Sequence, residues 1–168
     1  MKSCSFFGHR DTPQTEKLKQ KVRETIERLI VEEKVDTFLF GSRSKFDELC
    51  HIVVTELKEK YPHIQRIAYL CKHESGCYVG EGTGLKQRIK KLTGREGYVP
   101  EYEDIRKSDR VNSAGRASYV ERNQWMIDAS NFVIIGLKRS EIQKGKSGTE
   151  LAYKYAVKQK VSVAVLAV

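Results

Sequence analysis

Three stretches of the chain share a pattern of short apolar runs that end in glycine. Residues 3–8, 36–41 and 131–136 read SCSFFG, DTFLFG and NFVIIG. Short apolar runs bounded by turn residues are typical of strands buried on both faces of a parallel sheet. Residues 64–70 and the valine-rich residues 161–168 predict two further strands. The pattern thus predicts a sheet of about five strands.

Apolar residues recur at helical spacing between these strands. From Leu18 to about Glu33 they lie on one helical face, and Thr12 followed by Pro13 is a typical helix start. The same reasoning predicts helices over residues 44–60, 117–129 and 148–158. Strands that alternate with helices of these lengths indicate βαβ units and a parallel sheet. We expect an α/β fold, a Rossmann-like three-layer sandwich with helices on both faces and strand order 3-2-1-4-5.

The 168 residues fit one domain over 1–168, apart from a long glycine-containing stretch at about 71–116. Loops of this length in compact domains are usually functional or disordered. The stretch follows the third strand, so it leaves the sheet at the edge where the glycines lie. We interpret it as an insert. A lid over a site at that edge is one hypothesis, and a disordered segment is the alternative.

Composition and charge narrow the class of protein. No apolar run is long enough to span a bilayer, and the start of the chain does not resemble a signal peptide, which indicates a cytoplasmic protein without membrane partners. Cys71, His73 and Cys77 match no usual zinc spacing, so we predict neither a metal site nor a cofactor. The net charge of +9 suggests affinity for anions, but the charge is spread along the chain.

Polar residues follow the strands at the edge where ligands bind in such sheets. Because the carboxyl ends of parallel strands meet at one edge, the residues after each strand are expected to lie together. Glycines let backbone amides approach an anion, arginine matches phosphate geometry, and a helix N-terminus favours negative charge. The predicted phosphate site comprises Gly8, His9, Arg10, Gly41, Ser42, Arg43, Arg116, Tyr119, Arg122, Asn123, Gly136, Ser147, Gly148, Thr149 and Glu150.

Several of these residues also have a structural interpretation. Ser147 and Glu150 fit a capping box, in which both side chains satisfy amides of the helix itself. His9 and Arg10 could be ordinary turn residues. Tyr119 could stack on a base or pack under the insert, and the sequence leaves both alternatives open.

Three motifs together resemble the YpsA-like family of the SLOG superfamily. They are CSFFGHRDTP, GRASYVERNQWMIDASNFVII and KSGTELAYKYAVKQKV. The superfamily includes the "lonely guy" phosphoribohydrolases and DNA-processing proteins, and it is associated with nucleotide-derived ligands. The resemblance implies a Rossmann-like fold and a nucleotide or nucleotide-derived small molecule as the partner. Relatives often self-associate, so it also raises the alternative of a homodimer.

The resemblance also implies specific roles and one departure. Arg122 looks like the arginine that the phosphoribohydrolases carry before their fourth strand, and Gly148-Thr149 looks like their phosphate-binding Gly-Thr. Their glutamate three residues after the threonine is replaced by Ala152. Glu150 is acidic but is rotated by about 200° around the helix from that position.

The leading hypothesis is accordingly a nucleotide-binding protein, a sensor or sequestering module. An alternative is an enzyme that hydrolyses an N-glycosidic bond, using Arg122 with Glu150, Asp11 or Glu121 as the acid group. A third alternative is binding of single-stranded nucleic acid, for which the insert offers the aromatic residues Tyr78, Tyr98 and Tyr102.

Overall fold

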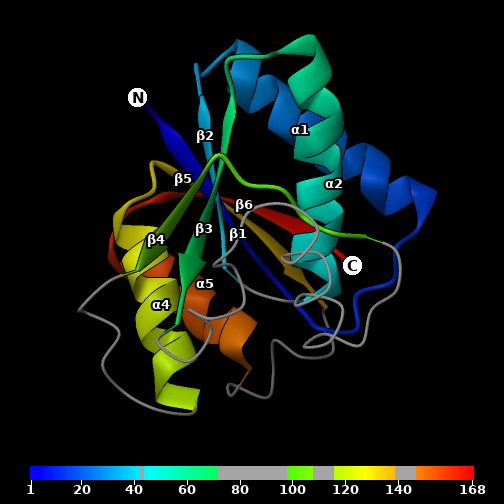
Figure 1. Cartoon of the computed structure of the whole chain (residues 1–168). Coiled ribbons are helices and arrows are strands. Elements are labelled where there is room, and N and C mark those ends of the chain that lie inside the picture. Colours follow the sequence, from blue (N-terminus) through cyan, green and yellow to red (C-terminus); the bar gives the residue numbers. More distant parts are fainter. Residues whose placement is uncertain (42–43, 72–97, 108–115, 139–146) are drawn as a thin grey trace.

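A six-stranded parallel sheet forms the centre of the protein (Figure 1). The structure is a computed structural model that describes residues 1–41, 44–71, 98–107, 116–138 and 147–168. The strand order is β4-β3-β2-β1-β5-β6. The elements are β1 (Ser3–Gly8), α1 (Glu16–Val31), β2 (Thr37–Phe40), α2 (Lys45–Lys60), β3 (Gln65–Leu70), β4 (Asp104–Lys107), α4 (Arg116–Asp128), β5 (Phe132–Leu137), α5 (Gly148–Lys158) and β6 (Ser162–Ala167).

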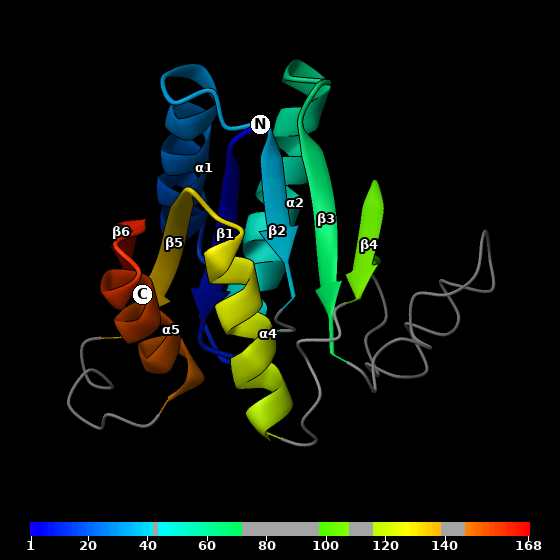
Figure 2. The ribbon, with the colours of Figure 1, turned by 90° about the vertical axis from the view of Figure 1, so that its left-hand side faces the viewer.

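Helices cover both faces of the sheet, as the apolar pattern predicts. α1 and α2 pack on one face around buried residues such as Phe6 and Phe40, and α4 and α5 pack on the other around residues such as Ile135. Figure 2 shows the two layers on either side of the sheet. The α/β class is confirmed, and the arrangement is consistent with a Rossmann-like fold.

The predicted number and order of strands were wrong because of β4. The five predicted strands keep their relative order, but β4 lies beyond β3 and becomes the edge of the sheet. Its sequence, Asp-Ile-Arg-Lys, is mostly charged and exposed, so it lacks the apolar run that marked the other strands. β4 comes from the predicted insert. The structure also describes residues 98–103 of the insert, whereas residues 72–97 and 108–115, which include most of the predicted lid, lie outside the described residues.

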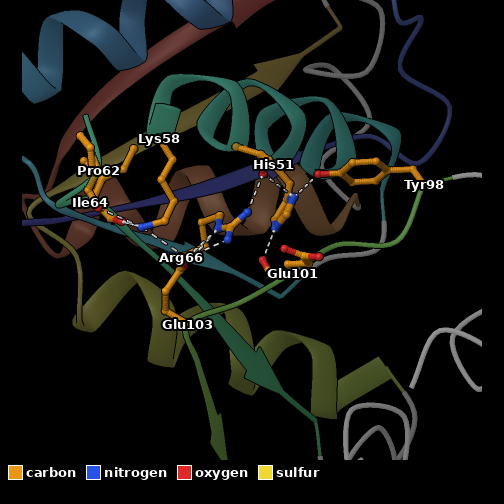
Figure 3. A network of polar contacts seen from close by, with 9 residues as sticks. His51, Lys58, Pro62, Ile64, Arg66, Tyr98, Glu101 and Glu103 are labelled. Atoms are coloured by element: carbon orange, nitrogen blue, oxygen red, sulfur yellow. Dashed lines mark hydrogen bonds and ion pairs between the residues drawn. The ribbon is translucent and has the colours of Figure 1, made fainter. Parts of the chain in front are cut away.

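A polar network attaches the segment before β4 to α2 (Figure 3). Arg66 is buried and donates to both carboxylate oxygens of Glu103, with Nη2 2.7 Å from Oε1. The Arg66 bonds lower the pKa of the Glu103 carboxyl to about 2, against the opposing effect of burial. His51 contacts the hydroxyl of Tyr98, and its Nε2 lies 2.9 Å from the carbonyl oxygen of Glu101. The sixth strand is therefore attached to the sheet partly by side-chain contacts between residues that are distant in sequence.

Helix starts follow capping side chains, with one difference from the prediction. Ser44 and Ser147 cap α2 and α5, accepting the backbone N–H of the residue three positions ahead. α1 begins later than Thr12-Pro13 because Thr15 provides its cap. Thr12 instead closes a turn, where its hydroxyl donates to the carbonyl of His9 over 2.8 Å.

Within the part of the chain that the structure describes, no helix is both long and apolar enough to cross a membrane. Cys4, Cys50 and Cys71 are buried free thiols.

Candidate functional site

The carboxyl edge of the sheet brings several predicted residues to neighbouring positions. Gly8 ends β1 and is paired with Gly136, the next-to-last residue of the adjacent strand β5. Gly41 follows β2, and α5 begins at the same edge with Gly148 (Figure 2). The predicted convergence of strand ends and helix starts is thus present in the fold.

Gly8 and Gly136 make room for the first apolar side chain of α2. A methyl group added at Gly136 would lie 2.5 Å from Cδ2 of Phe46, and one at Gly8 would overlap the same ring. Phe46 is fully buried. These two glycines bring a helix close to the strands, so their contacts in the structure are with Phe46.

Gly41 makes room for α4 in the same way, and one of the side chains that lie close to it belongs to an arginine. A methyl group at Gly41 would lie 2.6 Å from Sδ of Met126 and 3.0 Å from Cδ of Arg122. The lack of a side chain at Gly41 lets α4 bring Arg122 against the end of β2. Arg122 is only 4% exposed, so its guanidinium lies within the edge of the sheet.

The guanidinium of Arg122 contacts Cys71 and two residues of its own helix, α4. Nη1 lies 3.4 Å from Sγ of Cys71, which directly follows β3. Nη2 lies 3.4 Å from Oδ1 of Asn123, and the ring of Tyr119 lies 5.3 Å from the guanidinium carbon. Tyr119 is therefore a cation–π partner of Arg122 in this structure.

The predicted site did not include two buried residues beside Arg122. Cys71 donates to the backbone oxygen of Ser118 over 3.7 Å. The hydroxyl of Ser118 is fully buried and has no hydrogen-bond partner among the residues described. A serine on the first turn of a helix and a cysteine after a strand carry no distinctive spacing, so only their positions at the predicted edge could have indicated them.

The turn after β1 contacts the end of β5. The backbone N–H of Lys138 donates to Nε2 of His9 over 3.3 Å, and His9 is 6% exposed. The Nζ of Lys138 lies 2.9 Å from Asp11, and this hydrogen bond lowers the pKa of the exposed Asp11 carboxyl. Arg10 is exposed, and its carbonyl accepts the backbone N–H of Lys45 at the start of α2. His9 thus holds two strand ends together, while the Arg10 side chain faces solvent.

The first turn of α5 combines an open backbone with a buried carboxylate. A side chain at Gly148 would meet no atom within 4 Å. Thr149 and Glu150 are buried. Oε1 of Glu150 lies 3.4 Å from Nζ of Lys154, and Oε2 has no hydrogen-bond partner in the described parts of the chain. Ser147 caps the helix by accepting from the Glu150 amide, so the first half of the predicted capping box is present.

A groove between α4 and α5 runs from this turn to Asn123, the residue after Arg122. Its volume is about 220 Å³, and both Asn123 and Gly148 border it. Apolar side chains form much of its wall, and two lysines stand on its α5 side. Its other lining residues are Val120, Gln124, Ile127, Leu151, Ala152, Lys154, Tyr155 and Lys158.

Three predicted site residues are not placed by the structure. Ser42 and Arg43 lie outside the described residues, and Arg116 begins α4 without a described side chain. Tyr98 and Tyr102, proposed for base stacking, pack against His51, with ring centroids 5.6 and 4.9 Å away. Both tyrosine rings are thus engaged in contacts within the protein and do not form an open surface for base stacking.

No protein-family model matches the chain, and no curated protein is significantly similar to it. The resemblance to YpsA-like proteins of the SLOG superfamily thus stays a prediction from the three sequence motifs.

Proposed function

We propose that the protein binds a nucleotide or nucleotide-derived ligand through a phosphate at the carboxyl edge of the sheet. One observation carries this proposal: Asn123, which accepts a hydrogen bond from Arg122, borders the same groove as the open start of α5 at Gly148. A guanidinium and a helix N-terminus both favour a phosphate. The helix start borders the groove, and Arg122 lies behind it, next to the lining residue Asn123, so both can contribute to an anion site with room for an attached group.

The groove suggests how the rest of the ligand is accommodated. Its volume of about 220 Å³ is below the ~300–1,000 Å³ typical of complete small-molecule sites. It would hold part of a ligand, such as a base or sugar, while the phosphate lies on the amides at Gly148. Lys154 and Lys158 on the same side of the groove add positive charge. A sensor or sequestering module needs no more than this.

Thermal shifts against nucleoside monophosphates, NAD, ADP-ribose and cyclic nucleotides test the proposal. A ligand at 100 times its dissociation constant adds about 2.7 kcal/mol to stability. For a domain of this size that raises Tm by roughly 5–10 °C. A shift with one of these classes supports the proposal, and the absence of any shift across the panel contradicts it.

Two substitutions locate the binding site. Gly148→Leu fills open space at the start of α5 without meeting protein atoms, so it should abolish the shift while the unliganded Tm stays nearly unchanged. Arg122→Met removes the charge at similar length and should reduce the shift. Arg28→Met is the matched control, because Arg28 is exposed on α1 and its loss lowers the net charge equally. Unchanged shifts in both site variants would place the ligand elsewhere.

Hydrolysis of an N-glycosidic bond is the second candidate, and Glu150 is the observation that favours it. A carboxylate that is 5% exposed, with one oxygen unpartnered among the described residues, is a suitable acid or base beside a phosphate site. Chromatography of a nucleotide incubated with the protein tests it. Release of free base supports hydrolysis if Glu150→Gln prevents it. Recovery of intact nucleotide supports binding alone.

A further inference from the structure

The two edges of the sheet differ in how they are protected. Exposed edge strands invite pairing with other chains, and proteins usually guard them with charge or short length. β4 has both devices, because it is four residues long and carries Asp104, Arg106 and Lys107. β6 has neither: its six residues, Ser-Val-Ala-Val-Leu-Ala, contain no charged side chain and no proline.

The side chains of β6 are accessible although most are apolar. Every residue of the strand is exposed or partly exposed, and Val165 at its centre is 49% exposed. Val163 packs toward the α4 and α5 side, whereas Ala164 and Leu166 pack toward the α1 and α2 side. Apolar surface thus borders this edge on both faces of the sheet.

Among the strands that the structure describes, none pairs with the outer side of β6. β6 is parallel to β5, and the N–H of Val168 donates to the carbonyl of Leu137. In a parallel ladder, alternate residues direct both backbone groups to the same neighbouring strand. The backbone N–H and C=O groups of the even-numbered residues therefore point toward β5. The backbone groups of Val163, Val165 and Ala167 point away from β5, toward the open edge of the sheet.

We propose that β6 pairs with β6 of a second copy of this chain, antiparallel across a two-fold axis at Val165. Val165 then lies opposite the partner copy's Val165, and Val163 lies opposite the partner copy's Ala167. Each of these pairs exchanges two backbone hydrogen bonds. The interface is self-complementary, as two-fold symmetry requires, and it joins the two sheets into one continuous sheet.

The distribution of charge favours a second copy in this orientation. Each copy carries a net charge of +9, so contact is least repulsive through an uncharged strand. Lys158 and Lys160 precede β6. Antiparallel pairing places Lys160 and the partner copy's Lys160 about ten residues apart along the paired strands, which is roughly 30 Å at ~3.3 Å per residue. That separation is well beyond the ~8 Å screening length at physiological salt. Parallel pairing would place them side by side. An acidic peptide would find no opposite charge within β6.

Sedimentation-velocity ultracentrifugation between micromolar and 100-micromolar protein tests the proposal. The unaltered chain should become dimeric with increasing concentration. Val165→Lys places two like charges at the two-fold axis and should leave a monomer. Ile105→Lys is the matched control, because Ile105 is 36% exposed on the opposite edge strand and the substitution adds the same charge. That variant should dimerise as the unaltered chain does.

Amide hydrogen exchange gives an independent readout with the unaltered protein. The amides of Val163, Val165 and Ala167 should become more protected as protein concentration rises, while those of Ala164 and Leu166 stay protected throughout. A chain that is monomeric at all concentrations would overturn the proposal. A dimer that Val165→Lys leaves intact, with no concentration-dependent protection in β6, would overturn it equally.

Discussion

Arg122 and Cys71, which are 51 residues apart, meet at the carboxyl edge, where Nη1 of the arginine donates to Sγ of the cysteine over 3.4 Å. Both residues are buried, at 4% and 0% exposure. The contact joins α4 to the end of β3 and holds the guanidinium in a fixed place. A group that is already ordered loses little entropy when a ligand binds, so this relationship would favour the proposed binding of a phosphate at the edge.

Alanine substitution at two glycines should show which of them the packing of the protein requires. Gly136→Ala places a methyl group against Phe46, and we expect a loss of about 2 kcal/mol because overpacked cores typically lose ~1–3 kcal/mol. Gly148→Ala meets no neighbouring atom and should leave the free energy of unfolding unchanged or raise it by up to about 1 kcal/mol. Urea unfolding measures both. Equal stability of the two variants would show that Phe46 does not occupy the space over Gly136.

Ser147→Ala tests whether the start of α5 needs its serine for folding or for the ligand. The Ser147 hydroxyl accepts the Glu150 amide, so its loss should cost about 1 kcal/mol of stability. Ligand affinity should change little, because a phosphate would use the remaining free amides. Ser44→Ala removes the equivalent cap of α2 and provides the comparison. If Ser147→Ala lowered affinity more than tenfold and Ser44→Ala did not, the hydroxyl would be a direct ligand contact.

Five strands of the sheet were predictable because each is an apolar run, although only β1, β2, β3 and β5 are largely buried and β6 is exposed or partly exposed along its length. β2 and β5 follow the predicted runs closely, and both are almost entirely buried. β4 was not predictable from local sequence, since an exposed edge strand needs no apolar side chains. It is attached instead by Arg66 and Glu103, which are 37 residues apart.

The residues that meet at the carboxyl edge were predictable, but their contacts were not. Topology alone places glycines, Arg122 and the start of α5 at one edge. Phe46 packs against Gly8 and Gly136 because of the position of α2 on the sheet. No local sequence pattern encodes that position. The start of α1 shows a similar limit: Thr12-Pro13 and Thr15 are both acceptable caps, and the turn that Thr12 closes with His9 decides between them.

The ion pair between Arg66 and Glu103 should determine how firmly β4 is attached. Glu103→Gln leaves the buried guanidinium of Arg66 without its charged partner. Removal of one partner from a fully buried pair costs ~3–5 kcal/mol, and about 2 kcal/mol is expected here because Glu103 is partly exposed. Glu101→Gln, on the same segment, is exposed and should change stability by less than about 0.5 kcal/mol. Chemical unfolding compares the two, and similar losses would argue against a specific role of the pair.

The stability of the protein should depend on pH through His51. Burial lowers the pKa of His51 to about 4, with Arg66 adding to the decrease against the opposing bond to Glu101. A neutral ring can donate from Nε2 to the Glu101 carbonyl while Nδ1 accepts from Tyr98. The ordinary pKa of histidine in an unfolded chain is about 6.5. Between these two values the unfolded state binds a proton that the folded state does not, so stability falls as pH falls.

The expected loss between pH 7 and pH 4 is about 3 kcal/mol, because each unit of pKa difference is worth about 1.4 kcal/mol. Urea unfolding at several pH values measures it. His51→Gln should be less stable at pH 7 but lose little more on acidification to pH 4. His63→Gln removes an exposed histidine and should follow the unaltered protein throughout. If His51→Gln retained the full pH dependence, the acid sensitivity would arise from other groups, and the segment at Tyr98 and Glu101 would not depend on a neutral His51.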